Sequence, residues 1–149
     1  MPKGLRLSEA LATSRRYSLS KRRIDPTEHQ IQAAFIEMVR RNFHRYPVLQ
    51  IAYAVPNAQK LLSLARRPGA MLRHLVDEGL VSGVPDWVLP WPSCGYNGLW
   101  IEFKARAYAN PSTEQKRFHA LLRDHGHRVE VMYDALAAWG LVVAYLTIK

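Results

Sequence analysis

The chain has 149 residues, of which 48% are hydrophobic and 22% charged, and its formal net charge at pH 7 is +9. These values fit one globular domain with a buried core, and so basic a domain commonly binds a polyanion, most often nucleic acid. The single cysteine, Cys94, excludes an intramolecular disulfide and a cysteine-based zinc site. Apolar runs are too short to span a membrane, and the N-terminus lacks a signal-peptide core, so we expect an intracellular, cytoplasmic protein.

Residues 1–25 are predicted to form a basic arm outside a folded domain that takes up residues 26–149. The arm carries seven basic residues, Arg22 and Arg23 among them, against two acidic ones. Arms of this kind often lie along phosphate backbones. A flexible, solubilising tail would have the same composition, so both interpretations stay open.

A helix is predicted from Asp25 to about His44. Asp25 would be the N-cap and Pro26 the first helical residue, with an apolar stripe of Ile31, Phe35, Met38 and Val39. Glu28 lies on the side of this stripe, which aims its carboxylate inward or at the edge of a cleft. A role in a capping box is the simpler alternative for Glu28.

After Pro47, residues 48–55 are predicted to form a strand that Pro56-Asn57 closes. Residues 58–67 fit either a helix or an ordered loop. A further helix is expected over residues 70–78, ended by Gly79, and its predicted buried side consists of Met71, Leu72, Leu75 and Val76.

The stretch from Val84 to Lys104 reads as two apolar strands joined by a loop rich in glycine, proline and asparagine. Alternation in a strand places Glu102 and Lys104 on one face, and a hairpin would bring Asp86 alongside Glu102. Charges inside apolar strands would be costly to bury unless a metal ion or partner compensates them. The pattern therefore predicts a divalent-metal site with a lysine beside it, although solvated residues on a sheet face are the common alternative for so short a motif.

The rest of the chain predicts a helix, a strand and a final helix. Ser112 caps the first helix, whose core stripe would be Phe118, Leu121 and Leu122, and Gln115 faces the same way. The strand covers residues 128–133, and Asp134 caps a last helix to about Leu146. Each of the six histidines is expected to be solvated or at a helix end, because none has zinc-type spacing.

The order of elements and a set of short motifs together resemble the virus-type replication-repair nuclease (VRR-NUC) domain of the PD-(D/E)xK nuclease superfamily, in its stand-alone phage or bacterial form. The resemblance covers roughly residues 26 to 147. It departs from the usual family pattern at residues 105–110, where basic and glycine residues are more common. The motifs are Glu28-x-x-x-Gln32, Pro56-Asn57, Gly83-Val84-Pro85-Asp86, Leu99-Trp100-Ile101-Glu102-Phe103-Lys104, Ser112-x-x-Gln115 and Gly126-x-x-Val129.

The resemblance implies an α/β fold with a restriction-endonuclease-like core, in which helices flank a mixed central sheet. It further implies that Mg²⁺ or Mn²⁺ is held by Asp86, Glu102 and the backbone carbonyl of Phe103, with Glu28 in support. Lys104 would orient or help deprotonate the attacking water, and Gln115 would steady the lysine or the phosphate.

The expected partner is DNA, and the expected activity is that of a homodimeric endonuclease for branched duplexes such as four-way junctions. A flap-cutting or restriction-type endonuclease of the same fold, or a binding module without catalysis, is the alternative. Non-specific phosphate contacts are predicted for Lys60, Arg66, Arg67, Arg106, Lys116, Arg22 and Arg23.

Overall fold

The computed structural model describes residues 25–56, 67–106 and 109–148, so the predicted arm, except Asp25, and the segment 57–66 lie outside the described residues. No helix in the described part of the chain is long and apolar enough to cross a membrane. The elements in chain order are α2 (Glu28–Arg41), the 3-10 helix η1 (Pro47–Ile51), β1 (Tyr53–Ala54), α4 (Pro68–Asp77), β2 (Trp87–Leu89), β3 (Leu99–Phe103), α5 (Thr113–Asp124), β4 (Arg128–Met132) and α6 (Ala135–Thr147).

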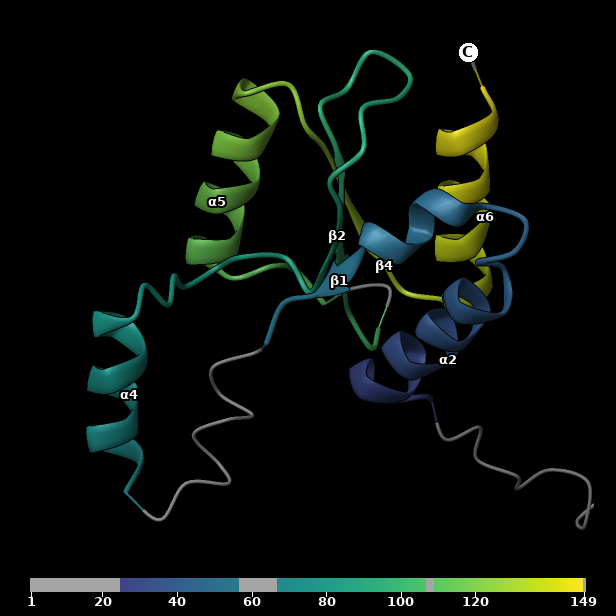
Figure 1. The fold of residues 1–149 in the computed structure, drawn as a ribbon. Helices are drawn as coiled ribbons and strands as arrows, with labels where there is room; N and C mark the ends of the chain where they lie inside the picture. The colour runs from purple at the N-terminus through teal and green to yellow at the C-terminus, as the bar shows by residue number, and fades with distance from the viewer. Residues whose placement is uncertain (1–24, 57–66, 107–108, 149) are drawn as a thin grey trace, which may run out of the picture.

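The strands form one mixed sheet in the order β1-β2-β3-β4 (Figure 1). β1, β2 and β3 pair antiparallel, whereas β3 and β4 run parallel. Helices α2 and α6 cover one face of the sheet and α5 covers the other (Figure 1). This arrangement confirms the predicted α/β architecture with a mixed central sheet flanked by helices.

The main hydrophobic core lies between the sheet and the pair α2 and α6. The ring of Phe35 on α2 meets Trp87 edge-on, with centroids 5.0 Å apart, and lies 5.2 Å from the ring of Phe103. Alternation along β3 sends Leu99, Ile101 and Phe103 into this core and Glu102 to the α5 face. The packing of α2 therefore fixes the strand that carries the predicted acidic residue.

Helix α2 begins two residues later than predicted. Thr27, not Asp25, is the N-cap: its hydroxyl accepts the N–H of Gln30, and the Gln30 side chain accepts the N–H of Thr27. This reciprocal capping box satisfies two backbone donors at once. The helix ends at Arg41, and Glu28 takes no part in the capping box, so the capping role considered for it is wrong.

The strand predicted over residues 48–55 is mostly absent. Pro47 starts the 3-10 helix η1, in which Leu49 is buried, and only Tyr53 and Ala54 pair with β2. Proline at the first helical position favours a helical turn. In addition, β2 has only three residues, so it offers few partners for a longer β1. The apolar residues of this stretch form a 3-10 helix, and Leu49 packs in the hydrophobic core.

Helix α4 forms where predicted, but its predicted buried side is only partly covered, because Met71 and Leu75 are half-buried and Leu72 and Val76 are exposed. No residue of α4 is buried, and Leu72 and Val76 are 38% and 53% exposed. Periodicity gives the apolar side of a helix, but it does not say whether another element packs against that side. The predicted stop at Gly79 is confirmed, with φ of +97° and the two hydrogen bonds of a Schellman motif.

The hairpin between β2 and β3 is confirmed, with Trp87 opposite Ile101. Its tip is a turn in which Cys94 and Gly95 both have positive φ, at 51° and 78°. The Cys94 thiol donates to the carbonyl of Ile148. The loop therefore folds back on the end of α6.

Helix α5 has the predicted cap and a different core residue. Ser112 forms a capping box with Gln115, and Gly126 ends the helix at φ of +79°. Leu121, predicted to be buried, is 48% exposed, whereas His119 is the buried residue of the helix. The predicted strand and last helix are confirmed as β4 and as α6, which Asp134 caps.

Candidate active site

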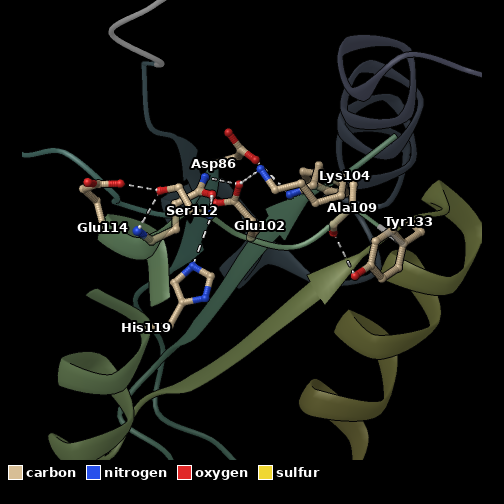
Figure 2. Close-up of polar contacts among 10 residues, drawn as sticks. Asp86, Glu102, Lys104, Ala109, Ser112, Glu114, His119 and Tyr133 are labelled. Atoms are coloured by element: carbon tan, nitrogen blue, oxygen red, sulfur yellow. Dashed lines mark hydrogen bonds and ion pairs between the residues drawn. The ribbon is translucent and has the colours of Figure 1, made fainter. Parts of the chain in front are cut away.

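Three charged side chains from the β2–β3 hairpin meet beside the start of α5 (Figure 2). Asp86 directly precedes β2, Glu102 is the fourth residue of β3, and Lys104 follows that strand. Antiparallel pairing of Trp87 with Ile101 sets Asp86 next to Glu102, as the sequence predicts. Asp86 and Lys104 line one cavity, and Glu102 is buried in contact with Lys104.

Glu102 is almost completely buried, with 1% of its surface exposed. Its Oε1 atom lies 2.7 Å from Lys104 Nζ and also accepts a short hydrogen bond from Gln115 Nε2. Its other oxygen, Oε2, has no hydrogen-bond partner in the described part of the chain and lies 3.9 Å from His119 Nε2. The carboxylate is therefore held firmly on one side only.

Burial raises the pKa of Glu102 to about 7, and the nearby charge of Asp86 adds to the rise, while Lys104 opposes it. Burial lowers the pKa of Lys104, but the contact with Glu102 and the charges of Glu102, Glu28 and Asp86 outweigh it and raise that pKa. Lys104 is consequently a cation at neutral pH. Two carboxylates that resist simultaneous ionisation are typical of functional sites.

Replacing Glu102 with glutamine is expected to stabilise the metal-free protein at pH 8. Glu102 titrates near 4.5 when solvated and near 7 in the fold, so its ionisation costs stability progressively between these values and fully above pH 7. Glutamine has the same shape and no charge. We expect its Tm in EDTA to exceed that of wild type by roughly 5 °C at pH 8, with little gain at pH 4.5. If calorimetry at pH 8 gave Glu102→Gln a lower Tm than wild type, burial of the ionised Glu102 would not be costly.

Asp86 is tied to the neighbouring strand by its own carboxylate. Its Oδ2 accepts the N–H of Phe103 at 2.8 Å, while its backbone carbonyl accepts from Val55 N–H and, at 3.4 Å, from Gln32 Nε2. The N–H of Lys104 bonds to Met132 on β4, so the N–H and carbonyl of Phe103 turn to the opposite side, toward Asp86. The Phe103 carbonyl therefore lies on the same side of β3 as the Asp86 carboxylate, and its role as a metal ligand stays a prediction.

Gln115 links the start of α5 to Glu102. Its Oε1 accepts the N–H of Ser112 at 2.8 Å, and its Nε2 donates to Glu102. Both halves of the amide are thus used, one for the helix cap and one for the carboxylate. The contact is with Glu102 and not with Lys104, so Gln115 steadies the acid.

Gly83 determines how closely α5 approaches the hairpin. A Cβ atom at Gly83 would lie 2.5 Å from the carbonyl oxygen of Glu114 and 2.9 Å from the N–H nitrogen of Gln115. Only glycine permits this approach at φ of +85°. The closeness places Gln115 within reach of Glu102.

Gly83→Ala is expected to be about 2 kcal/mol more destabilising than Gly79→Ala, because overpacking adds to backbone strain. Gly79 is a matched control: it also has positive φ, at +97°, but a Cβ there would meet no atom within 4 Å. Urea unfolding of the two variants measures the difference. Equal losses of unfolding free energy would show that the contact with α5 is unimportant.

A cavity of about 520 Å³ opens in front of these residues. Glu28, Asp86, Lys104, Gln115 and Gly83 are among the residues that line it. Glu28 is exposed at its edge, from the first turn of α2, and its charge raises the pKa of Glu102. A second cavity of about 620 Å³ lies between α2 and β1 and shares Glu28 and Asp86 with the first. The site therefore lies in a surface cleft made of two adjoining cavities.

The predicted phosphate-contacting residues are only partly within the described chain. Arg67, Arg106 and Lys116 are exposed, as such contacts require. The other four, Lys60, Arg66, Arg22 and Arg23, lie outside the described residues.

His119 was expected to be solvated or at a helix end, which is wrong, because it is buried in the site in the middle of α5. It is 2% exposed, and burial, with the charges of Arg123 and Lys104, lowers its pKa to about 4. The imidazole is therefore neutral at physiological pH. A signal was present, because residues four apart share a helix face and His119 is four residues after Gln115.

The donor chemistry of this site fits a hard divalent cation. In the described ranges, no three His, Cys, Asp or Glu side chains form a ready-made metal cluster. Mg²⁺, however, keeps several waters and needs only one or two protein carboxylates. Asp86 and Glu102 are the candidates for these. Burial and, after it, the charge of Asp86 raise the pKa of Glu102, and a bound cation would offset both effects. Such a set of two acids, a lysine and an open cleft can support phosphodiester hydrolysis.

Comparison with known proteins agrees with this geometry. The family model described as the VRR-NUC domain matches residues 26–135. A solved structure named "VRR_NUC domain protein" is similar to 84% of this chain and 92% of its own, with a TM-score of 0.66 and 19% sequence identity. A search of curated proteins found no match. At this identity the structural likeness speaks for the fold.

Proposed function

The chain belongs to the VRR-NUC family, a family of nucleases whose partner is DNA, and we propose that it is a metal-dependent endonuclease acting on branched DNA. The substrate would be a four-way junction or a related intermediate of replication, repair or recombination. The enzyme would act in the cytoplasm of a bacterium or of a phage-infected host cell.

One observation carries the proposal: the buried carboxylate of Glu102 lies against Lys104 and near Asp86, and these two neighbours line an open cleft. A solvated sheet face would not bury an ionisable glutamate at 1% exposure. Burying it is costly, and a site for a cation compensates that cost.

Asp86, Glu102 and the Phe103 carbonyl would hold Mg²⁺ or Mn²⁺, with Glu28 reaching the ion directly or through water. When bound, such an ion neutralises phosphate charge and makes water more acidic. The position of Glu28 supports this role, because Glu28 lines the same cleft as Asp86.

Lys104 and Gln115 would order the site around Glu102. Lys104 is cationic, so it would donate hydrogen bonds to the scissile phosphate and orient the attacking water. Gln115 would hold Glu102 by the hydrogen bond that it already makes. Neither role requires a proton to leave Lys104.

Arg67, Arg106 and Lys116, together with Lys60, Arg66, Arg22 and Arg23, would contact phosphates outside the cleft. Contacts of this kind are independent of sequence and weaken steeply with salt. They fit recognition of DNA by shape and charge.

We also propose a homodimer, since two sites related by a two-fold axis suit a four-way junction. Helix α4 offers apolar side chains that the described residues leave unburied. Sedimentation of wild type and of Val76→Glu tests whether that side contributes.

The proposal is tested with labelled four-way junction, flap, linear duplex and single strand, each with Mg²⁺, Mn²⁺ or EDTA. We expect metal-dependent cutting of the junction in preference to the linear duplex. Preferred cutting of flaps or of a linear sequence would favour the flap-type or restriction-type alternative. Tight binding of every substrate without any cutting would favour a non-catalytic binding module.

A further inference from the structure

His119 and Glu102 present two buried polar atoms to each other, and neither atom has a hydrogen-bond partner among the described residues. These are His119 Nε2 and Glu102 Oε2, and they lie 3.9 Å apart. Figure 2 shows the imidazole rising from α5 toward the carboxylate. Both residues are at least 98% buried, so the pair is shielded from bulk water.

Buried polar atoms nearly always find partners, so an opposed pair of this kind calls for an explanation. An N–H···O hydrogen bond is typically about 2.9 Å long, so a movement of about 1 Å would form one here. The other oxygen of Glu102 already has two donors, Lys104 and Gln115. Only Oε2 is left unheld.

We propose that His119 is a positioning residue, which donates its Nε2–H to Glu102 Oε2 and so fixes the orientation of the carboxylate toward a divalent cation. This inference rests on the proposed function. Carboxylates that bind metals are themselves hydrogen-bonded, and the loss of such outer partners typically lowers metal affinity or activity by about 10–100-fold.

His119 acts through Glu102 and does not touch the substrate. It is not among the residues that line the cleft, whereas Gln115, one turn earlier on α5, is one of them. A neutral imidazole carries one N–H, so the proposal also requires the tautomer with the proton on Nε2. That requirement can be checked without any metal.

The alternative is that His119 only fills space beneath α5. His119→Gln and His119→Met separate the two roles, because these side chains have similar length and volume but only glutamine has an N–H donor at its end. We expect His119→Met to bind Mn²⁺ at least about tenfold more weakly than wild type, and His119→Gln to stay within about threefold. Calorimetric titration of Mn²⁺ without DNA measures this, and thermal melting confirms that both variants fold.

The inference is overturned if wild type binds Mn²⁺ and both variants bind it as tightly as wild type does. It is also overturned if both variants lose affinity by the same factor. A nitrogen NMR spectrum of the metal-free protein that places the His119 proton on Nδ1 would also overturn it. If wild type neither binds Mn²⁺ nor cuts DNA, the proposed function fails and this inference fails with it. The first three results leave the nuclease assignment standing.

Discussion

Asp86→Asn is expected to slow DNA cleavage by about 10³-fold while the fold and DNA binding persist. The asparagine carbonyl can still accept the N–H of Phe103, the bond that ties Asp86 to β3 at 2.8 Å. What is lost is a negative charge that would hold a cation. A metal ion contributes several kcal/mol to the transition state, and about 4 kcal/mol corresponds to a factor of about 10³.

Single-turnover cleavage and fluorescence anisotropy in EDTA measure the two properties separately. Asp86→Ala is the comparison, because it removes the charge and also leaves the Phe103 N–H without an acceptor. We therefore expect the alanine variant to unfold about 1–3 kcal/mol more easily than the asparagine variant. Wild-type cleavage by Asp86→Asn would remove Asp86 from the proposed metal site.

Lys104→Met is expected to reduce cleavage by about 10²–10³-fold, because the cation that faces the phosphate is replaced by a neutral side chain of similar length. The contact of 2.7 Å with Glu102 is lost as well. Since Lys104 lowers the pKa of Glu102, the pKa of that carboxyl should rise further in the variant. Raising the pH would then ionise Glu102 without restoring the cleavage rate.

Lys116→Met is the matched control, since Lys116 is exposed on the neighbouring helix α5 and carries the same charge. It should keep the cleavage rate at saturating DNA and bind somewhat more weakly at higher salt. If Lys104→Met and Lys116→Met slowed cleavage equally, general charge and not position would explain the effect of Lys104.

The core of the site could be predicted because it depends on local rules. Alternation along β3 places Glu102 and Lys104 on one face, and the hairpin loop returns Asp86 beside them. Helix periodicity likewise predicted that Gln115 lies on the inward-facing side of α5. Each of these needs only the sequence and the geometry of one element or one turn.

Other features depend on what packs where, and periodicity does not contain that information. The side of α4 that carries Leu72 and Val76 is apolar but uncovered by the described residues, and Leu121 on α5 is exposed for the same kind of reason. His119 is buried because α5 lies over Glu102, which only the assembled sheet reveals. Two residues, Asp25 and Thr27, could each cap the start of α2. The structure has Thr27 as the N-cap, with reciprocal hydrogen bonds between Thr27 and Gln30.

The central claim is that Asp86 and Glu102 hold a divalent cation that makes this chain a nuclease. Titration of Mg²⁺ into the metal-free protein with a labelled four-way junction tests it most directly. We predict no cleavage in EDTA, a saturable rise in rate with Mg²⁺, and no such rise for Asp86→Asn. Cleavage that persists in EDTA, or a Mg²⁺ response that Asp86→Asn shares with wild type, would contradict it.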